Sequence, residues 1–104
     1  MINPQRGDVA LTVNGQERIL RLTLGALAAL EHRLEATSLV EMVSRFEDGS
    51  FNTGDLLALV WAGLNGGGWD ISFEDVGDCT IEGGPMEAAR AGARLLAVTF
   101  SETS

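Results

Sequence analysis

Lysine is absent from the sequence, and all seven basic residues are arginines. Fifteen aspartates and glutamates outnumber them, so the formal net charge of the 104-residue chain is −8. A protein that binds nucleic acid replaces the counterions of the phosphate backbone with clustered positive side chains. This chain has no such cluster, and its composition therefore argues against nucleic acid as a direct partner.

Cysteine and long hydrophobic runs are also scarce. Cys79 is the only cysteine, which excludes an internal disulfide and a cysteine-rich metal site and suits a reducing, cytoplasmic compartment. The longest apolar run, Leu56 to Leu64, is about half the length of a membrane-spanning helix, so we expect no membrane partner. A chain of this length has enough residues for one hydrophobic core. Residues 1–104 are therefore expected to form a single domain that ends in a short polar tail, residues 101–104.

Residues 8–23 alternate between apolar and polar side chains, the period of half-buried β-strands. Asn14-Gly15 interrupts the alternation and tolerates the positive φ angles of a tight turn. The outward positions include Asp8 and Arg21. The inward positions are Val9, Leu11, Val13, Leu20 and Leu22. The pattern predicts a β-hairpin over residues 8–23.

From residue 24 onward the apolar residues recur at helical spacing. The first helix has Thr23 as its N-cap. Its predicted inward stripe consists of Leu24, Leu27, Leu30 and Leu34. A second helix begins at Ser38, which is predicted to form a capping box with Glu41, and it ends at Asp48-Gly49.

The third helix is capped by Asn52 or Thr53 and ends at the glycine run 66–68. It is apolar around most of its circumference, which predicts the most buried helix of the fold. A brief fourth helix follows Ser72, and the last helix begins after Gly83-Gly84 with Pro85 in its first turn. The predicted inward stripe of the last helix is Met86, Ala89, Ala93, Leu96 and Phe100. The fold class is thus α+β: an N-terminal β-hairpin (8–23) followed by a mainly helical region (24–100) of four or five short helices.

The sequence carries no motif that predicts catalysis, a cofactor or a metal site. The glycine run 66–68 lacks the following Lys-Ser/Thr of a phosphate loop and is explained by a helix C-cap and a flexible connection. His32 lacks a neighbouring nucleophile or second ligand. The acidic residues near the fourth helix are Asp70, Glu74, Asp75 and Asp78. Their spacing differs from that of a calcium loop and fits the acidic first turn of a short helix.

Two other features indicate a partner surface. The last helix is rich in small residues, which allow another helix to approach its backbone closely. Large aromatic side chains lie in or next to loops, where a ring either covers the edge of the core or anchors a partner. The candidate interface residues are Trp61, Trp69, Phe73, Ala89, Gly92 and Ala93.

Several blocks of the sequence are similar to one known family. The blocks are Arg6-Gly7-Asp8, Arg21-Leu22-Thr23-Leu24-Gly25-Ala26-Leu27-Ala28-Ala29-Leu30-Glu31, Asp55-Leu56-Leu57 before Ala62-Gly63-Leu64, and Ile81-Glu82-Gly83-Gly84 before the closing helix. In this order, over about residues 6–100, the chain resembles the gene transfer agent tail protein family of phage-like particles in alphaproteobacteria.

The resemblance implies a role in building the tail of a phage-like particle in the bacterial cytoplasm. The family is described both as a tail tube protein and as a member of the tail assembly chaperone group. Tail tube proteins of long-tailed phages resemble β-sandwiches with one helix, whereas this sequence is mainly helical. We therefore expect a non-catalytic tail assembly chaperone that binds the tape-measure protein until the tube assembles around it.

The expected partners are the tape measure and the major tail protein, and a homo-oligomer is compatible with the sequence. An apolar groove near Trp61, Trp69 and the small-residue face of the last helix would pack on amphipathic helices of the tape measure. A structural tail tube component that stays in the particle is the alternative. A small acidic metal-binding or enzymatic domain is the third hypothesis.

Overall fold

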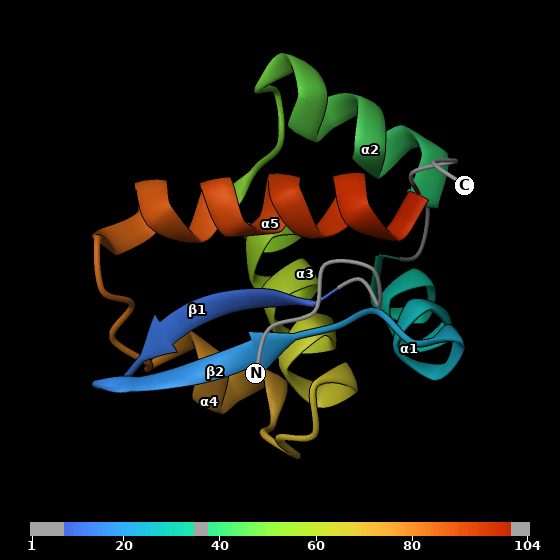
Figure 1. Cartoon of the computed structure of the whole chain (residues 1–104). Coiled ribbons are helices and arrows are strands. Elements are labelled where there is room, and N and C mark those ends of the chain that lie inside the picture. The colour runs from blue at the N-terminus through green and yellow to red at the C-terminus, as the bar shows by residue number, and fades with distance from the viewer. Residues whose placement is uncertain (1–7, 35–37, 101–104) are drawn as a thin grey trace.

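Figure 1 shows the computed structural model of the chain, which describes residues 8–34 and 38–100. In this part of the chain, two antiparallel strands are followed by five helices. The elements are β1 (Val9–Val13), β2 (Gln16–Leu20), α1 (Leu24–Leu34), α2 (Leu39–Asp48), α3 (Thr53–Gly66), α4 (Phe73–Gly77) and α5 (Gly84–Phe100). The predicted fold class, a hairpin followed by short helices, is confirmed. The predicted polar tail, residues 101–104, lies outside the described residues.

The hairpin is closed by Asn14 and Gly15, whose φ angles are 52° and 80°. Beyond the hairpin, β1 forms a single antiparallel bridge between Val13 and Ile81. The Asn14 amide donates to the Thr80 carbonyl oxygen at 2.8 Å. The segment before α5 therefore lies along the outer edge of β1, a pairing that the alternation pattern did not predict.

Asp8 was predicted to face outward, and this was wrong because it is only 3% exposed. Its two carboxylate oxygens accept hydrogen bonds from Nε and Nη2 of Arg21, at 2.6 and 3.0 Å. The hydrogen bond to Asp8 raises the pKa of Arg21 above its ordinary value, against the effect of desolvation, so the guanidinium keeps its charge. A bidentate ion pair satisfies the carboxylate in the interior, an arrangement that alternation alone does not reveal.

Helix α3 lies at the centre of the fold, as predicted, and contacts α1, β2, α4 and α5 (Figure 1). Asn52 is its N-cap, because Asn52 Oδ1 accepts from the Asp55 amide at 2.7 Å while Asp55 Oδ2 accepts from the Asn52 amide at 3.2 Å. Its buried residues are Asp55, Ala58, Leu59, Val60, Ala62, Gly63 and Leu64.

The C-terminal end of α3 packs directly on the backbone of β2. The Arg21 amide donates to the Gly63 carbonyl oxygen at 2.9 Å. A Cβ at Gly67 would lie 1.8 Å from the Ile19 carbonyl oxygen, so no larger residue fits there. The glycine run, explained above as a cap and a flexible connection, therefore also serves close packing.

Helix α2 begins at the predicted N-cap, since Ser38 Oγ accepts from the Glu41 amide at 3.1 Å. Only this half of the predicted capping box is formed among the described residues, because the carboxylate of Glu41 lies 3.5 Å from Arg45 Nη2 instead of bonding to the Ser38 amide. Arg45 also ties α2 to α3 through its Nη1, 2.9 Å from Asp55 Oδ2. Phe46 stacks on Phe51 with ring centroids 4.3 Å apart, which closes the connection between the two helices.

Helix α1 departs from its predicted stripe at one position. Leu24 is 86% exposed, whereas Leu30 is fully buried and Ala26 is buried beside it. Thr23 is the N-cap as predicted, because its Oγ1 accepts from the Ala26 amide at 3.0 Å. Leu24 thus occupies the first position of the helix, where helical spacing alone is a weak guide to burial.

Helix α5 is rotated relative to its predicted stripe. The buried residues are Ala88, Ala91, Gly92, Leu95 and Leu96. Met86 is 67% exposed and Phe100 is 41% exposed, Ala93 is exposed, and Ala89 is half-buried, so only Leu96 of the predicted stripe is buried. Both stripes have helical spacing, but the observed one places the adjacent Leu95 and Leu96 inside together.

Candidate partner-binding surface

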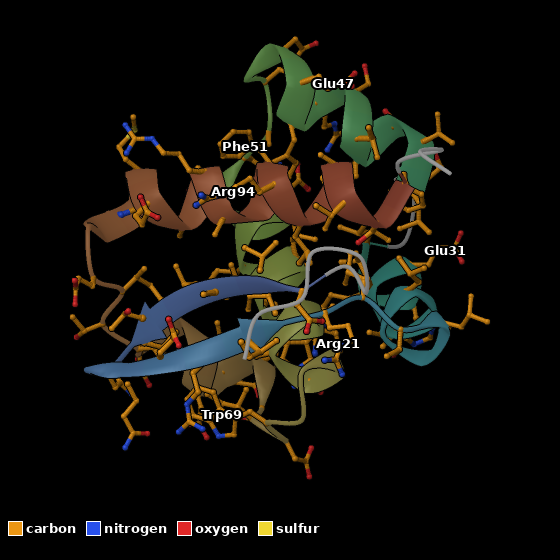
Figure 2. All side chains as sticks on the ribbon, in the orientation of Figure 1. Arg21, Glu31, Glu47, Phe51, Trp69 and Arg94 are labelled. Atoms are coloured by element: carbon orange, nitrogen blue, oxygen red, sulfur yellow. The ribbon has the colours of Figure 1, made fainter. Side chains whose placement is uncertain are left out.

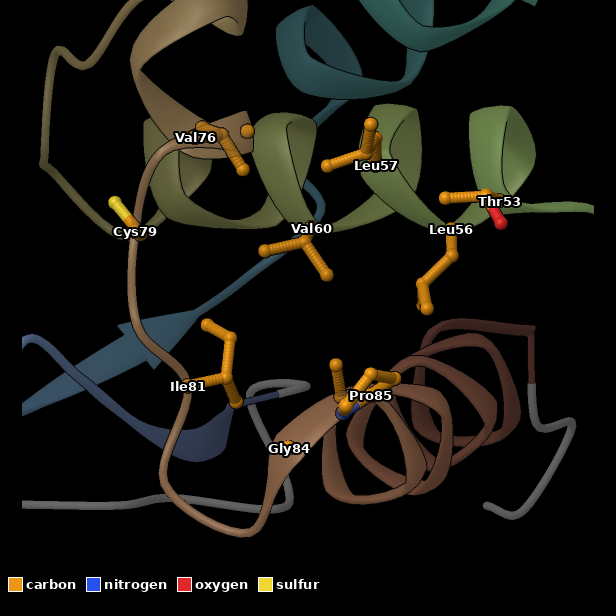
Figure 3. Close-up of a pocket in the computed structure, with 11 residues that line it drawn as sticks. Thr53, Leu56, Leu57, Val60, Val76, Cys79, Ile81, Gly84 and Pro85 are labelled. Carbon is orange, nitrogen blue, oxygen red and sulfur yellow. The ribbon is translucent and has the colours of Figure 1, made fainter.

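An apolar groove lies between α3 and the chain that leads into α5 (Figure 3). Its lining residues are Thr53, Leu56, Leu57 and Val60 of α3; Val76 and Gly77 of α4; Cys79 and Ile81 of the connection; and Gly84, Pro85 and Ala88 of α5. The groove encloses about 200 Å³. This volume is below the roughly 300–1,000 Å³ of sites for drug-sized ligands, and it suits anchoring side chains of a protein partner.

The local sequence explains why the groove is apolar and stays open. Val60 and Val76 are buried at its base, and none of its described lining residues is charged. The thiol of Cys79 is engaged, since it donates to the Asp75 carbonyl oxygen at 3.3 Å and accepts from Asn14 Nδ2 at 3.7 Å. Gly84, with φ of 73°, turns the chain into α5 so that the small Ala88 faces the groove. The groove was not predicted, although the apolar circumference of α3 was a signal of an additional apolar face.

The candidate aromatic residues form two separate clusters with arginines. Trp61 and Phe73 are in edge-to-face contact with ring centroids 6.0 Å apart, and the Arg33 guanidinium lies 3.9 Å from the Phe73 ring centroid. The Arg18 guanidinium lies 4.0 Å from the Trp69 ring centroid. Both arrangements are cation–π contacts that cover the rings from one side. Figure 2 shows Trp69 below the hairpin, on the side of the sheet away from α5.

The small residues of α5 are divided between the interior and the surface. A Cβ at Gly92 would lie 3.0 Å from Leu59 Cδ2 and 3.3 Å from Phe46 Cε2, so the close neighbours of Gly92 are α3 and α2 of this same chain. Trp61 instead lines a hollow with residues of α1. Among the described residues, Trp61, Trp69 and Gly92 therefore have different surroundings and do not line one shared groove, and of the three small candidates Ala93 alone is exposed.

Two further observations concern a metal site and a membrane-spanning helix. Within residues 8–34 and 38–100, no group of three or more His, Cys, Asp or Glu side chains is arranged to hold a metal ion. Of the helices described there, none combines the length and the apolar character needed to cross a membrane.

Comparison with known proteins gives one result. A family model described as phage tail tube protein, GTA-gp10, matches residues 6–102. No curated protein and no solved structure matches the chain. Since the family match covers nearly the whole chain, the protein belongs to the phage tail tube protein, GTA-gp10 family.

Proposed function

We propose that this chain is a non-catalytic tail assembly chaperone that binds the tape-measure protein and leaves before the tail is complete. The observation that carries the proposal concerns the two outer strand edges of the small sheet. Its strands are five residues each, and part of each outer edge is in contact with other segments of the same chain.

The contacts at the two edges are specific. The Arg21 amide, just after β2, is bonded to the Gly63 carbonyl oxygen, and the Ile19 carbonyl oxygen lies against Gly67. On the other side, the Glu82 amide donates to the Thr12 carbonyl oxygen at 3.0 Å. A subunit that builds a ring by joining sheets needs free strand edges. Each edge here is partly occupied within the chain, which favours association through helices and grooves instead.

A structural tail tube component is the second candidate, because the matched family is described as a tail tube protein. In that case the subunits persist in the finished particle and associate through surfaces other than the sheet edges. The net charge of −8 serves either role, since it keeps complexes soluble.

Co-expression with the tape-measure protein of the same particle separates the two roles. A chaperone raises the soluble fraction of the tape measure and co-purifies with it in the absence of the major tail protein. A tube component alone leaves the tape measure insoluble and assembles with the major tail protein. A soluble fraction that does not rise would count against the chaperone.

A further inference from the structure

We propose that the groove between α3 and the start of α5 binds a cationic amphipathic helix. The apolar face of this helix would fill the groove, and its lysines and arginines would meet acidic side chains around it. The inference rests on the proposed function, because it names the chemistry of the partner segment that a chaperone of this kind would hold.

The charge distribution along the chain is the first observation. All lining residues of the groove come from residues 53–88. The wider stretch 46–89 contains no lysine or arginine. It contains nine acidic residues: Glu47, Asp48, Asp55, Asp70, Glu74, Asp75, Asp78, Glu82 and Glu87.

Two of these acidic residues are neighbours in sequence of residues that line the groove. Asp78 is exposed and stands between Gly77 and Cys79, which both line it. Glu82 is exposed and follows the lining residue Ile81, and it also lines an adjoining hollow beside β1. Within the described residues neither carboxylate lies in an ion pair, so both can attract a cation from outside the molecule.

Glu87 differs from these two, because it already has basic neighbours. Its carboxylate oxygens lie 3.5 Å from Arg90 Nη1 and 3.3 Å from Arg94 Nη2. The acidic side chains that remain available near the groove are therefore those of α4 and of the connection to α5, Asp78 and Glu82 among them.

A second copy of this chain is a poorer match in charge. Its formal net charge is −8, and of its described arginines Arg21 and Arg45 are paired with buried carboxylates, whereas the exposed Arg90 and Arg94 share Glu87. Two copies that met at the groove would bring their acidic residues together, which like-charge repulsion opposes. Charge complementarity therefore favours a cationic partner of a different sequence.

A direct test uses the full chain and fluorescein-labelled synthetic peptides. One 18-residue peptide places leucines on one helical face and lysines on the other, and its counterpart replaces every lysine by glutamate. Fluorescence anisotropy should show saturable binding of the lysine peptide and no binding of the glutamate peptide. Raising the salt from about 0.1 M to about 1 M shortens the screening length from about 10 Å to about 3 Å and should weaken binding at least about tenfold.

Gly77→Leu tests the location. Gly77 lines the groove, and a Cβ there would meet no heavy atom within 4 Å, so a side chain can begin at this position without a clash. We expect the leucine to extend into the groove and block it. Gly25→Leu is the matched control, because the nearest atom to a Cβ there is Thr23 Oγ1 at 3.9 Å, on a helix that does not line the groove. We expect at least about a tenfold loss of peptide affinity for Gly77→Leu and less than about a twofold change for Gly25→Leu.

A pair of neutralising variants tests the charge. Asp78→Asn with Glu82→Gln should weaken the lysine peptide about tenfold, whereas Glu31→Gln with Glu47→Gln, which removes the same charge from α1 and α2, should have a small effect. If the two pairs of substitutions weaken binding equally, the attraction depends only on the net charge of the chain, and the proposed site is overturned. A chain that binds neither peptide, or that self-associates in sedimentation and loses this with Gly77→Leu, would also overturn it. No tail protein is present in this assay, so its failure leaves the chaperone test above unaffected.

Discussion

A Cβ at Gly66 would lie 1.8 Å from the carbonyl oxygen of Arg21. Both groups belong to the backbone, so neither can rotate away as a side chain could. Gly66→Ala must therefore separate α3 from the chain after β2. We expect it to lower the free energy of unfolding by at least about 2 kcal/mol, measured by urea titration.

Gly77→Ala is the control for this effect, because a Cβ there meets nothing within 4 Å. Its free energy of unfolding should stay the same or rise by up to about 1 kcal/mol, as helix propensity predicts for alanine in place of glycine. Equal losses in the two variants would show that backbone proximity at Gly66 is not the cause.

Asp55 combines two stabilising contacts in a buried position. It accepts from the Asn52 amide at the start of α3 and pairs with Arg45 of α2. Asp55→Ala removes both contacts and should cost about 1 to 3 kcal/mol in chemical unfolding. Arg45→Ala removes the ion pair with Asp55 and the longer, exposed contact with Glu41 but keeps the Asn52–Asp55 cap, and it should cost less. A larger loss for Arg45→Ala would contradict this assignment.

Because α5 is rotated relative to the prediction, the adjacent residues Gly92 and Ala93 differ in burial. Gly92→Leu should destabilise the protein by about 2 kcal/mol or more, because its side chain would overlap Leu59 and Phe46. Ala93→Leu, on the exposed side, should change the free energy of unfolding by less than about 0.5 kcal/mol. Thermal unfolding of both variants, followed by circular dichroism, distinguishes the observed buried stripe from the predicted one. With the predicted stripe, Ala93→Leu would destabilise the protein more than Gly92→Leu.

Asp48 should contribute to the pH dependence of stability. Its pKa is lowered by a hydrogen bond from the Ser50 side chain and, next, by the Ser50 amide, whose nitrogen lies 3.0 Å from Oδ1. A carboxylate with a lowered pKa in the folded state stabilises above its ordinary pKa of about 3.9, and this is lost as the pH falls through the folded-state value. Asp48→Ala should therefore lower the melting temperature more at pH 7 than at pH 3. A loss of melting temperature in the variant that grows toward pH 3 would contradict this prediction.

Local signals along the chain were sufficient for the elements of this fold. The Asn14-Gly15 turn, the Ser38 and Ser72 caps and the change of period at residue 24 each act within a few residues, and each is observed. Burial of individual residues was predicted less well, because it depends on which helix lies opposite. Leu24 and Met86 have the spacing of core residues but are 86% and 67% exposed.

The candidate site was the least predictable part. Trp61, Trp69 and Gly92 are each notable in the sequence, but the fold gives them three different surroundings. The groove arises from residues that are ordinary one at a time, such as Leu57, Gly77 and Pro85, and becomes visible only when α3 and α5 are placed together. The acidic character of the segment that forms it is visible in the sequence, since residues 46–89 contain no lysine or arginine.

The most direct test of the chaperone role is quantitative mass spectrometry of purified particles, combined with the particle yield of a strain that lacks this gene. We expect finished particles to lack the protein and the deletion strain to form no complete tails. Particles that contain it at a copy number comparable to that of the major tail protein would contradict the account and identify a structural subunit of the tube.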